Sequence, residues 1–167
     1  GTKLGSAVEA SDNLASYKLG ALYKPAANGS VYLSYATSQL PPGGANFTLS
    51  ATAGNINNPN VDPQKGTNLE LGTKWDLLNE KLAVTAAVFE STNENEIATD
   101  PDGTALQVGE RQVRGIELGV VGAITSAWQI SAGAAYMDSE ISRGNRAGNN
   151  PTDGGVIQWT PEVTFTL

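Results

Sequence analysis

The sequence predicts an all-β protein whose antiparallel strands cross a membrane. Three observations lead to this prediction. Apolar and polar side chains alternate with period two over several segments, as they do along a strand that has one apolar face. Short connections between these segments alternate with long polar ones. Aromatic residues bracket the apolar face of two strands, as at the two boundaries of a membrane barrel.

Composition excludes several classes of function. The chain has 167 residues, a net charge of −7, no histidine and no cysteine. An acidic balance disfavours a nucleic-acid binder, which usually carries a basic stripe. The missing residue types remove disulfides, thiolate metal sites and the commonest general base. No apolar run reaches the ~20 residues of a transmembrane helix, but a barrel strand needs only about 9–11 residues.

The alternation predicts seven strands, each with one face of mainly apolar residues. The faces in chain order are Tyr17, Leu19, Ala21 and Tyr23; Val31, Leu33 and Tyr35; Leu69, Leu71, Trp75 and Leu77, with Thr73 as an exception; Leu82, Val84, Ala86 and Val88; Ile116, Leu118 and Val120; Trp128, Ile130, Ala132, Ala134 and Tyr136; and Val163, Phe165 and Leu167. Turns are expected at residues 25–29 and 78–80, where Pro, Asn and Gly or a short polar run interrupts the pattern.

The connections fall into two kinds. Those after Lys24, Leu77 and Gly122 are short, and those expected after Ala36, Ser91 and Glu140 are long and rich in Gly, Asn, Asp and Pro. Outer-membrane barrels have short turns at one rim and long loops at the other. The pattern therefore favours such a barrel over a soluble β-sandwich.

The two faces of the strands also differ in charge. Tyr17 and Tyr23 bracket the apolar face of the first strand, and Trp128 and Tyr136 bracket that of the sixth, with uncharged residues between them. A lipid-facing charge near the midplane would cost ~2–4 kcal/mol. The opposite face is expected to line the lumen and carries the charged residues Lys18, Glu70, Lys74, Asp76 and Glu117.

Several strings resemble a known family. They are "KLGALYKP" from Lys18, "YATSQ" from Tyr35, "PPGG" from Pro41, "ELGTKWD" from Glu70, "LAVTAAVF" from Leu82, "RGIELG" from Arg114 and "TPE" from Thr160. In this order and spacing they resemble the barrel of TonB-dependent outer-membrane siderophore receptors, and in particular the Fiu-type catecholate receptors. The resemblance covers nearly all of the chain from about Leu14 onward.

The resemblance implies a fold and a function. Residues 1–167 would form a partial barrel domain, an open arc of about seven strands, because the family closes its barrel with about 22 strands around a plug. The plug domain and the remaining strands are not expected in this sequence. The implied function is TonB-dependent, ligand-gated uptake of ferric catecholate siderophores, with no enzymatic activity and no cofactor beyond the transported iron–siderophore complex. The implied partners are this chelate, the TonB complex through the plug, and outer-membrane lipid and lipopolysaccharide, with no nucleic acid.

No catalytic constellation is found, because no nucleophile, base and orienting group occur together. A ferric catecholate is anionic and aromatic, and its iron is already saturated, so binding needs Arg or Lys and aromatic surface. The candidate ligand-binding residues are Arg111, Arg114, Arg143, Arg146 and Phe47. For each arginine the alternatives are lipopolysaccharide contact, a lumen ion pair or simple solvation.

The long connection from Thr37 to Gly66 is the candidate gate, because long loops are usually functional. The run Asp100-Pro101-Asp102-Gly103 lacks the ligand spacing of a calcium loop and is interpreted as a solvated turn.

Two other hypotheses stay open at this point. In the first, Lys3 to Val8 supplies an eighth strand and the chain closes as a small outer-membrane barrel with a structural or adhesion role. In the second, the chain is a soluble carbohydrate-binding β-sandwich. Gentle strand curvature would favour the arc of a wide barrel, and solubility without detergent would favour the sandwich.

Overall fold

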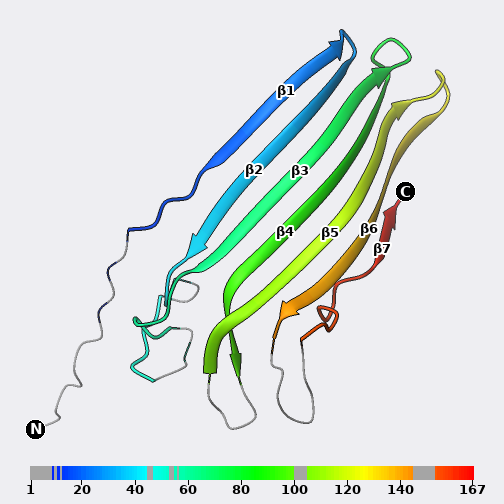
Figure 1. Cartoon of the computed structure of the whole chain (residues 1–167). Helices are drawn as coiled ribbons and strands as arrows, with labels where there is room; N and C mark the ends of the chain where they lie inside the picture. Colours follow the sequence, from blue (N-terminus) through cyan, green and yellow to red (C-terminus); the bar gives the residue numbers. More distant parts are fainter. Residues whose placement is uncertain are drawn as a thin grey trace, which may run out of the picture.

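The computed structural model describes residues 9, 11, 13–44, 47–52, 55, 57–99, 105–144 and 153–167. Within them the chain forms one antiparallel sheet in which every strand pairs with the next strand in sequence (Figure 1). The strands are β1 (Lys18–Ala26), β2 (Gly29–Leu40), β3 (Gln64–Leu77), β4 (Leu82–Thr99), β5 (Ala105–Ala123), β6 (Gln129–Arg143) and β7 (Val163–Thr166). The seven predicted strands are confirmed. No helix in the described part of the chain is long and apolar enough to span a membrane.

The sheet is a single open layer. Strands β1 and β7 form its two edges, and Figure 1 shows them on opposite sides of the array. Among the described residues no apolar side chain is buried, whereas a β-sandwich buries the inner faces of two sheets. The sandwich hypothesis therefore fails. The segment Lys3 to Val8, which the small-barrel hypothesis needs as an eighth strand, lies outside the described residues.

Cross-strand register assembles the predicted apolar residues into rows on one side of the sheet, which we call the apolar face. One row is Leu33, Leu71, Val88, Ile116, Tyr136 and Val163, and the next is Val31, Thr73, Ala86, Leu118, Ala134 and Phe165. Thr73 is tolerated there because its hydroxyl accepts a hydrogen bond from Trp75 Nε1 at 2.8 Å and donates one to the Ser30 carbonyl at 2.9 Å. The Thr73 hydroxyl therefore both donates and accepts a hydrogen bond, so an apolar environment on this face does not leave it unpaired.

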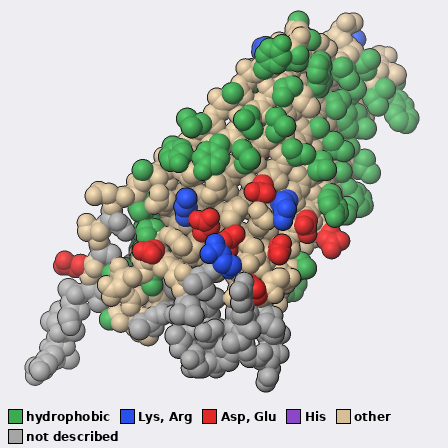
Figure 2. Space-filling model, viewed as in Figure 1, with side chains coloured by type: hydrophobic (Ala, Val, Ile, Leu, Met, Phe, Trp, Pro, Cys, Tyr) green, Lys and Arg blue, Asp and Glu red, His purple; other side chains and the backbone are tan. Residues whose placement is uncertain are grey.

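The apolar face ends sharply toward the long connections. One row beyond Ile116, the register aligns Glu90, Arg114 and Asp138, and further out it aligns Glu110 with Arg143. Figure 2 shows acidic and basic side chains gathered toward this end of the strands, and many hydrophobic side chains along the strands above them. On β4, β5 and β6 the loop-side boundary of the apolar face therefore lies between the row of Ile116 and the row of Arg114, whereas on β2 and β3 the row of Arg114 still carries Tyr35 and Leu69.

Several strands run farther past this boundary than predicted. Strand β4 extends to Thr99 and β5 begins at Ala105. The prediction that a loop starts after Ser91 is therefore wrong. Likewise β2 extends to Leu40, and the connection to β3 comprises residues 41–63. Beyond the membrane boundary both faces are polar, so the alternation disappears although the backbone ladder continues.

The opposite side of the sheet, the polar face, carries the charged residues predicted for the lumen. The Tyr32 hydroxyl donates a hydrogen bond of 2.6 Å to Glu70. The Tyr32 ring lies over Gly72, where a Cβ atom would come within 2.3 Å of it. Glycine is needed at this position of β3 because the ring occupies the space of a side chain.

Candidate ligand-binding rim

Arg111 lies on the polar face, near the end of β5 that meets the long connections. Its cross-strand partner on β4 is Asn93. The Nε atom of Arg111 lies 2.9 Å from Glu96 Oε2, and the Arg111 side chain is 52% exposed against 17% for Glu96. Among the candidate arginines that the structure describes, Arg111 is the one that faces the side expected to line the lumen.

Glu96 reaches the polar face through a β-bulge. The pairing of β4 with β5 shifts between Glu94 and Glu96, and Asn95 between them has a left-handed φ of 63°. A bulge inserts one unpaired residue and re-aims the side chains that follow it. The Asn93 amide also donates a hydrogen bond to Glu96 Oε1 at 2.5 Å. Glu94 and Glu96, which follow Ser91 where the sequence predicted a long connection, therefore lie within strand β4.

Arg114 faces the other way. It occupies the charged row at the boundary of the apolar face, between Glu90 and Asp138, and its Nη2 atom lies 3.9 Å from Glu140 Oε2. Both side chains of this pair are about half exposed. Arg114 thus belongs to the first row past Ile116 that carries charged side chains on this side of the sheet.

Arg143 lies on the same side as Arg114, farther from the membrane. Its Nε donates to Glu110 Oε2 at 2.9 Å, its Nη2 binds the same oxygen, and the Ser142 hydroxyl donates to Glu110 Oε1 at 3.0 Å. The hydrogen bond from Arg143 lowers the pKa of Glu110 below its ordinary value. Arg146 lies outside the described residues.

Phe47 lies in the connection of residues 41–63 and is 97% exposed, with a left-handed φ of 54°. It borders an open groove of about 480 Å³ whose other walls include Leu14, Pro42 and Leu49. An aromatic ring held in the open in this way has a free face on which a planar catechol could stack.

The far end of this connection is bonded to the bulge beside Arg111. The Gln107 side chain accepts a hydrogen bond from the Asp62 backbone nitrogen at 2.7 Å and donates one to the Asp62 carbonyl. Gln107 also donates to the Asn95 carbonyl at 3.0 Å, and the Asn95 amide donates to the Pro63 carbonyl at 3.1 Å. Sequence reasoning missed Asn95, Glu96 and Gln107, because nothing in an alternation pattern marks a bulge.

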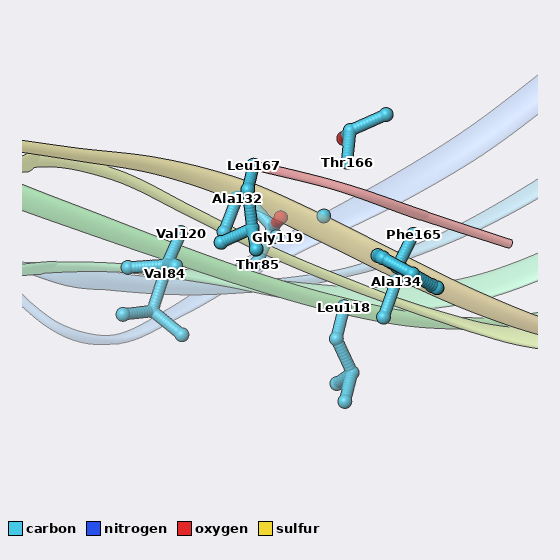
Figure 3. Close-up of a pocket in the computed structure, with 11 residues that line it drawn as sticks. Val84, Thr85, Leu118, Gly119, Val120, Ala132, Ala134, Phe165, Thr166 and Leu167 are labelled. Carbon is cyan, nitrogen blue, oxygen red and sulfur yellow. The ribbon is translucent and has the colours of Figure 1, made fainter.

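The apolar face carries shallow grooves of a different character. Figure 3 shows one of about 440 Å³, in which the small Ala132 and Ala134 lie among the larger Val120, Leu118 and Phe165. The lining of this groove is mainly apolar and contains no charged residue. Within the described residues no group of three or more acidic side chains is arranged to hold a metal ion, and residues 100–103 lie outside them.

Comparison with known proteins identifies the class. The family model "TonB dependent receptor-like, beta-barrel" matches residues 2–167. The chain belongs to this family, and it is part of an outer-membrane β-barrel.

The relatives to which the chain is similar include siderophore receptors of this family. The chain is 42% identical to the catecholate siderophore receptor Fiu of Escherichia coli O157:H7 over 159 residues, which is 94% of this chain and 21% of that protein. It is 43% identical to the probable TonB-dependent siderophore receptor PiuA of Acinetobacter baumannii over 133 residues, 78% of this chain and 18% of that protein. The crystal structure of the ferric-catecholate import receptor Fiu from E. coli K12, in its closed form, superposes with a TM-score of 0.81 at 40% identity, covering 93% of this chain and 22% of that one. The chain thus spans about a fifth of the length of these relatives.

Proposed function

We propose that the protein takes up ferric catecholate siderophores across the outer membrane in a TonB-dependent, ligand-gated way, and that this chain supplies part of its barrel wall and extracellular rim. The observation that carries the proposal is the 42% identity over 94% of the chain to the catecholate siderophore receptor Fiu. The arc-like sheet with one apolar and one polar face supports it, because such a wall separates lipid from a wet lumen.

The rim offers two chemistries that suit the ligand. The half-exposed guanidinium of Arg111 faces the polar side and can bind the anionic oxygens of a catecholate. Phe47 offers an exposed ring to a catechol plane. We assign these two residues to ligand contact, with Arg146 as a further candidate.

Arg114 and Arg143 suit another partner better. Both lie on the side of the wall that faces away from the polar face, at or beyond the lipid boundary. We propose that they face the headgroup layer of outer-membrane lipid and lipopolysaccharide. The TonB complex would act through a plug domain, and no residue of this chain is proposed to convert the chelate chemically.

Uptake of radioactive iron tests the proposal. A strain that lacks its other catecholate receptors is supplied with this protein, expressed from its own complete gene, and offered the ⁵⁵Fe complex of a tris-catecholate. We expect uptake that disappears when TonB is deleted. A neutral ferric tris-hydroxamate serves as the control ligand and should not be taken up. Equal uptake of both chelates, or uptake independent of TonB, would contradict the proposal.

A further inference from the structure

We propose that Glu96 is a positioning residue for Arg111, and that the bulge at Asn95 serves to bring the Glu96 carboxylate onto the polar face. The inference rests on the proposed function, because it takes Arg111 as a contact for an anionic ligand. It adds to that function a residue that would determine how strongly the ligand is held.

Glu96 contacts the guanidinium of Arg111 at Nε and leaves the edge with the two Nη groups open. Glu96 Oε2 lies 2.9 Å from Arg111 Nε, while Oε1 receives the Asn93 amide at 2.5 Å. The carboxylate is thus fixed on both oxygens. Because Nε is the atom held, both Nη groups remain available for a forked contact with an anion.

The bulge is itself fixed by several features. Asn95 adopts a left-handed φ of 63°, its amide donates to the Pro63 carbonyl, and its carbonyl accepts from Gln107. Opposite it, a Cβ atom on Gly109 would come within 2.8 Å of the Glu96 carbonyl oxygen. Without the extra residue, Glu96 would have the same parity as Glu94 and would face the outside of the wall.

Two effects of Glu96 on an anionic ligand oppose each other. Its charge repels the anion, but the carboxylate lies on the Nε side of Arg111, and water around the half-exposed guanidinium screens the repulsion. The ion pair of its carboxylate with Arg111 Nε removes rotamer freedom that a free arginine would lose on each binding event. We infer that the orienting effect of Glu96 on Arg111 is larger than its repulsion of the anion, because the contact at Nε leaves both Nη groups free to bind the ligand.

A double-mutant cycle on the protein expressed from its complete gene tests the inference. Affinity for a ferric hexadentate tris-catecholate is measured by calorimetry for the wild type, Glu96→Ala, Arg111→Ala and the double variant. We expect Glu96→Ala to weaken binding about three- to tenfold, as for coupled neighbours, and to have no effect when Arg111 is already alanine. Glu96→Gln, which keeps an acceptor for Nε, should retain most of the affinity. Glu94→Ala, on the opposite side of the wall, is the matched control and should bind like the wild type.

A second measurement needs no ligand. The rate at which a dicarbonyl reagent modifies Arg111 is followed by mass spectrometry, and it should rise in Glu96→Ala but not in Glu94→Ala. An unchanged rate overturns the positioning role even if no ligand binds. The role is also overturned if Glu96→Ala weakens binding equally in the Arg111→Ala background, or if it tightens binding. Failure of the wild type to bind the catecholate would instead contradict the proposed function, and so the two failures are distinguishable.

Discussion

Arg111 and Arg114 lie three residues apart on β5 and face opposite sides of the wall. A strand alternates its side chains, so an odd separation in sequence places two residues on different faces. Arg114 shares the parity of Ile116 and Leu118, which the alternation pattern predicts to face lipid. Counting parity from Ile116 therefore assigns the two arginines to different faces from the sequence alone.

The same alternation predicts the effect of charge at single positions. Leu118 is 56% exposed in the middle of the apolar face, and its strand neighbour Glu117 is on the polar face. We expect Leu118→Arg to destabilise the barrel by about 2–4 kcal/mol, because lipid cannot solvate the guanidinium. Urea unfolding in lipid vesicles measures the change. Glu117→Arg, the matched control, should be nearly neutral, and equal losses at both positions would contradict the assignment of the faces.

The ion pair of Arg143 with Glu110 predicts a local pH dependence. Because the pKa of Glu110 is lowered in the folded state, its stabilising effect is fully present above the ordinary carboxyl pKa. It is lost as the pH falls through the lowered value, so the loss begins near pH 4 to 4.5. The protection factors of the amides at residues 140–143, which correct for the intrinsic pH dependence of exchange, should fall over that range. The gain is small, about 0–1 kcal/mol, because Arg143 is largely exposed. In Glu110→Gln, this fall in protection should be absent, and its persistence would mean that another group is responsible.

At the scale of elements, the membrane-spanning part of each strand was predictable and the part beyond it was not. Between Leu69 and Leu77, for example, lipid on one side and the polar side opposite impose period two. Past the boundary, residues such as Thr92 and Gln112 still pair across β4 and β5, but both faces are wet. Backbone hydrogen bonds extend the sheet there, and the polar side-chain contacts that join the strands, such as Arg111 with Glu96, leave no period-two pattern. The bulge at Asn95 is hidden for the same reason.

Cross-strand packing on the polar face gives a prediction for β3. The Tyr32 ring occupies the space above Gly72, where an added Cβ atom would lie 2.3 Å from it. We expect Gly72→Ala to displace the ring, break the Tyr32–Glu70 hydrogen bond and cost about 1–3 kcal/mol, as overpacking does. Urea unfolding midpoints measure the loss. Gly20→Ala is the matched control, because its Cβ would meet the nearest atom, the Leu33 carbonyl oxygen, at an ordinary 3.6 Å.

A second substitution tests whether the Tyr32 ring or the backbone of Gly72 causes the loss of stability in Gly72→Ala. If the clash with Tyr32 is responsible, Tyr32→Ser should remove most of the additional cost of Gly72→Ala. A cost that stays the same without the ring would show that Gly72 is needed for its backbone alone.

At the scale of the whole molecule, the sequence predicted the sheet and its two faces but not the side-chain contacts that join the segments beyond the membrane boundary. The rim depends on contacts between segments far apart in sequence, such as Gln107 with Asp62. These contacts depend on the alignment of β3, β4 and β5 in the sheet, so no local pattern encodes them. The orientation of the wall, in contrast, follows from the connections. Long ones face outward from the cell and short ones face the periplasm.

Single-cysteine labelling tests this orientation, and no native cysteine within this chain competes for the label. We expect a bulky, membrane-impermeant maleimide to label Phe47→Cys in intact cells, since this position lies in a long connection and is 97% exposed. Asn79→Cys, in the short turn between β3 and β4, should react only after the outer membrane is permeabilised. Leu118→Cys should stay unlabelled in both conditions because lipid covers it. Labelling of Asn79→Cys but not Phe47→Cys in intact cells would reverse the orientation and, with it, place Arg111 at the periplasmic rim, where it could not meet an incoming chelate first.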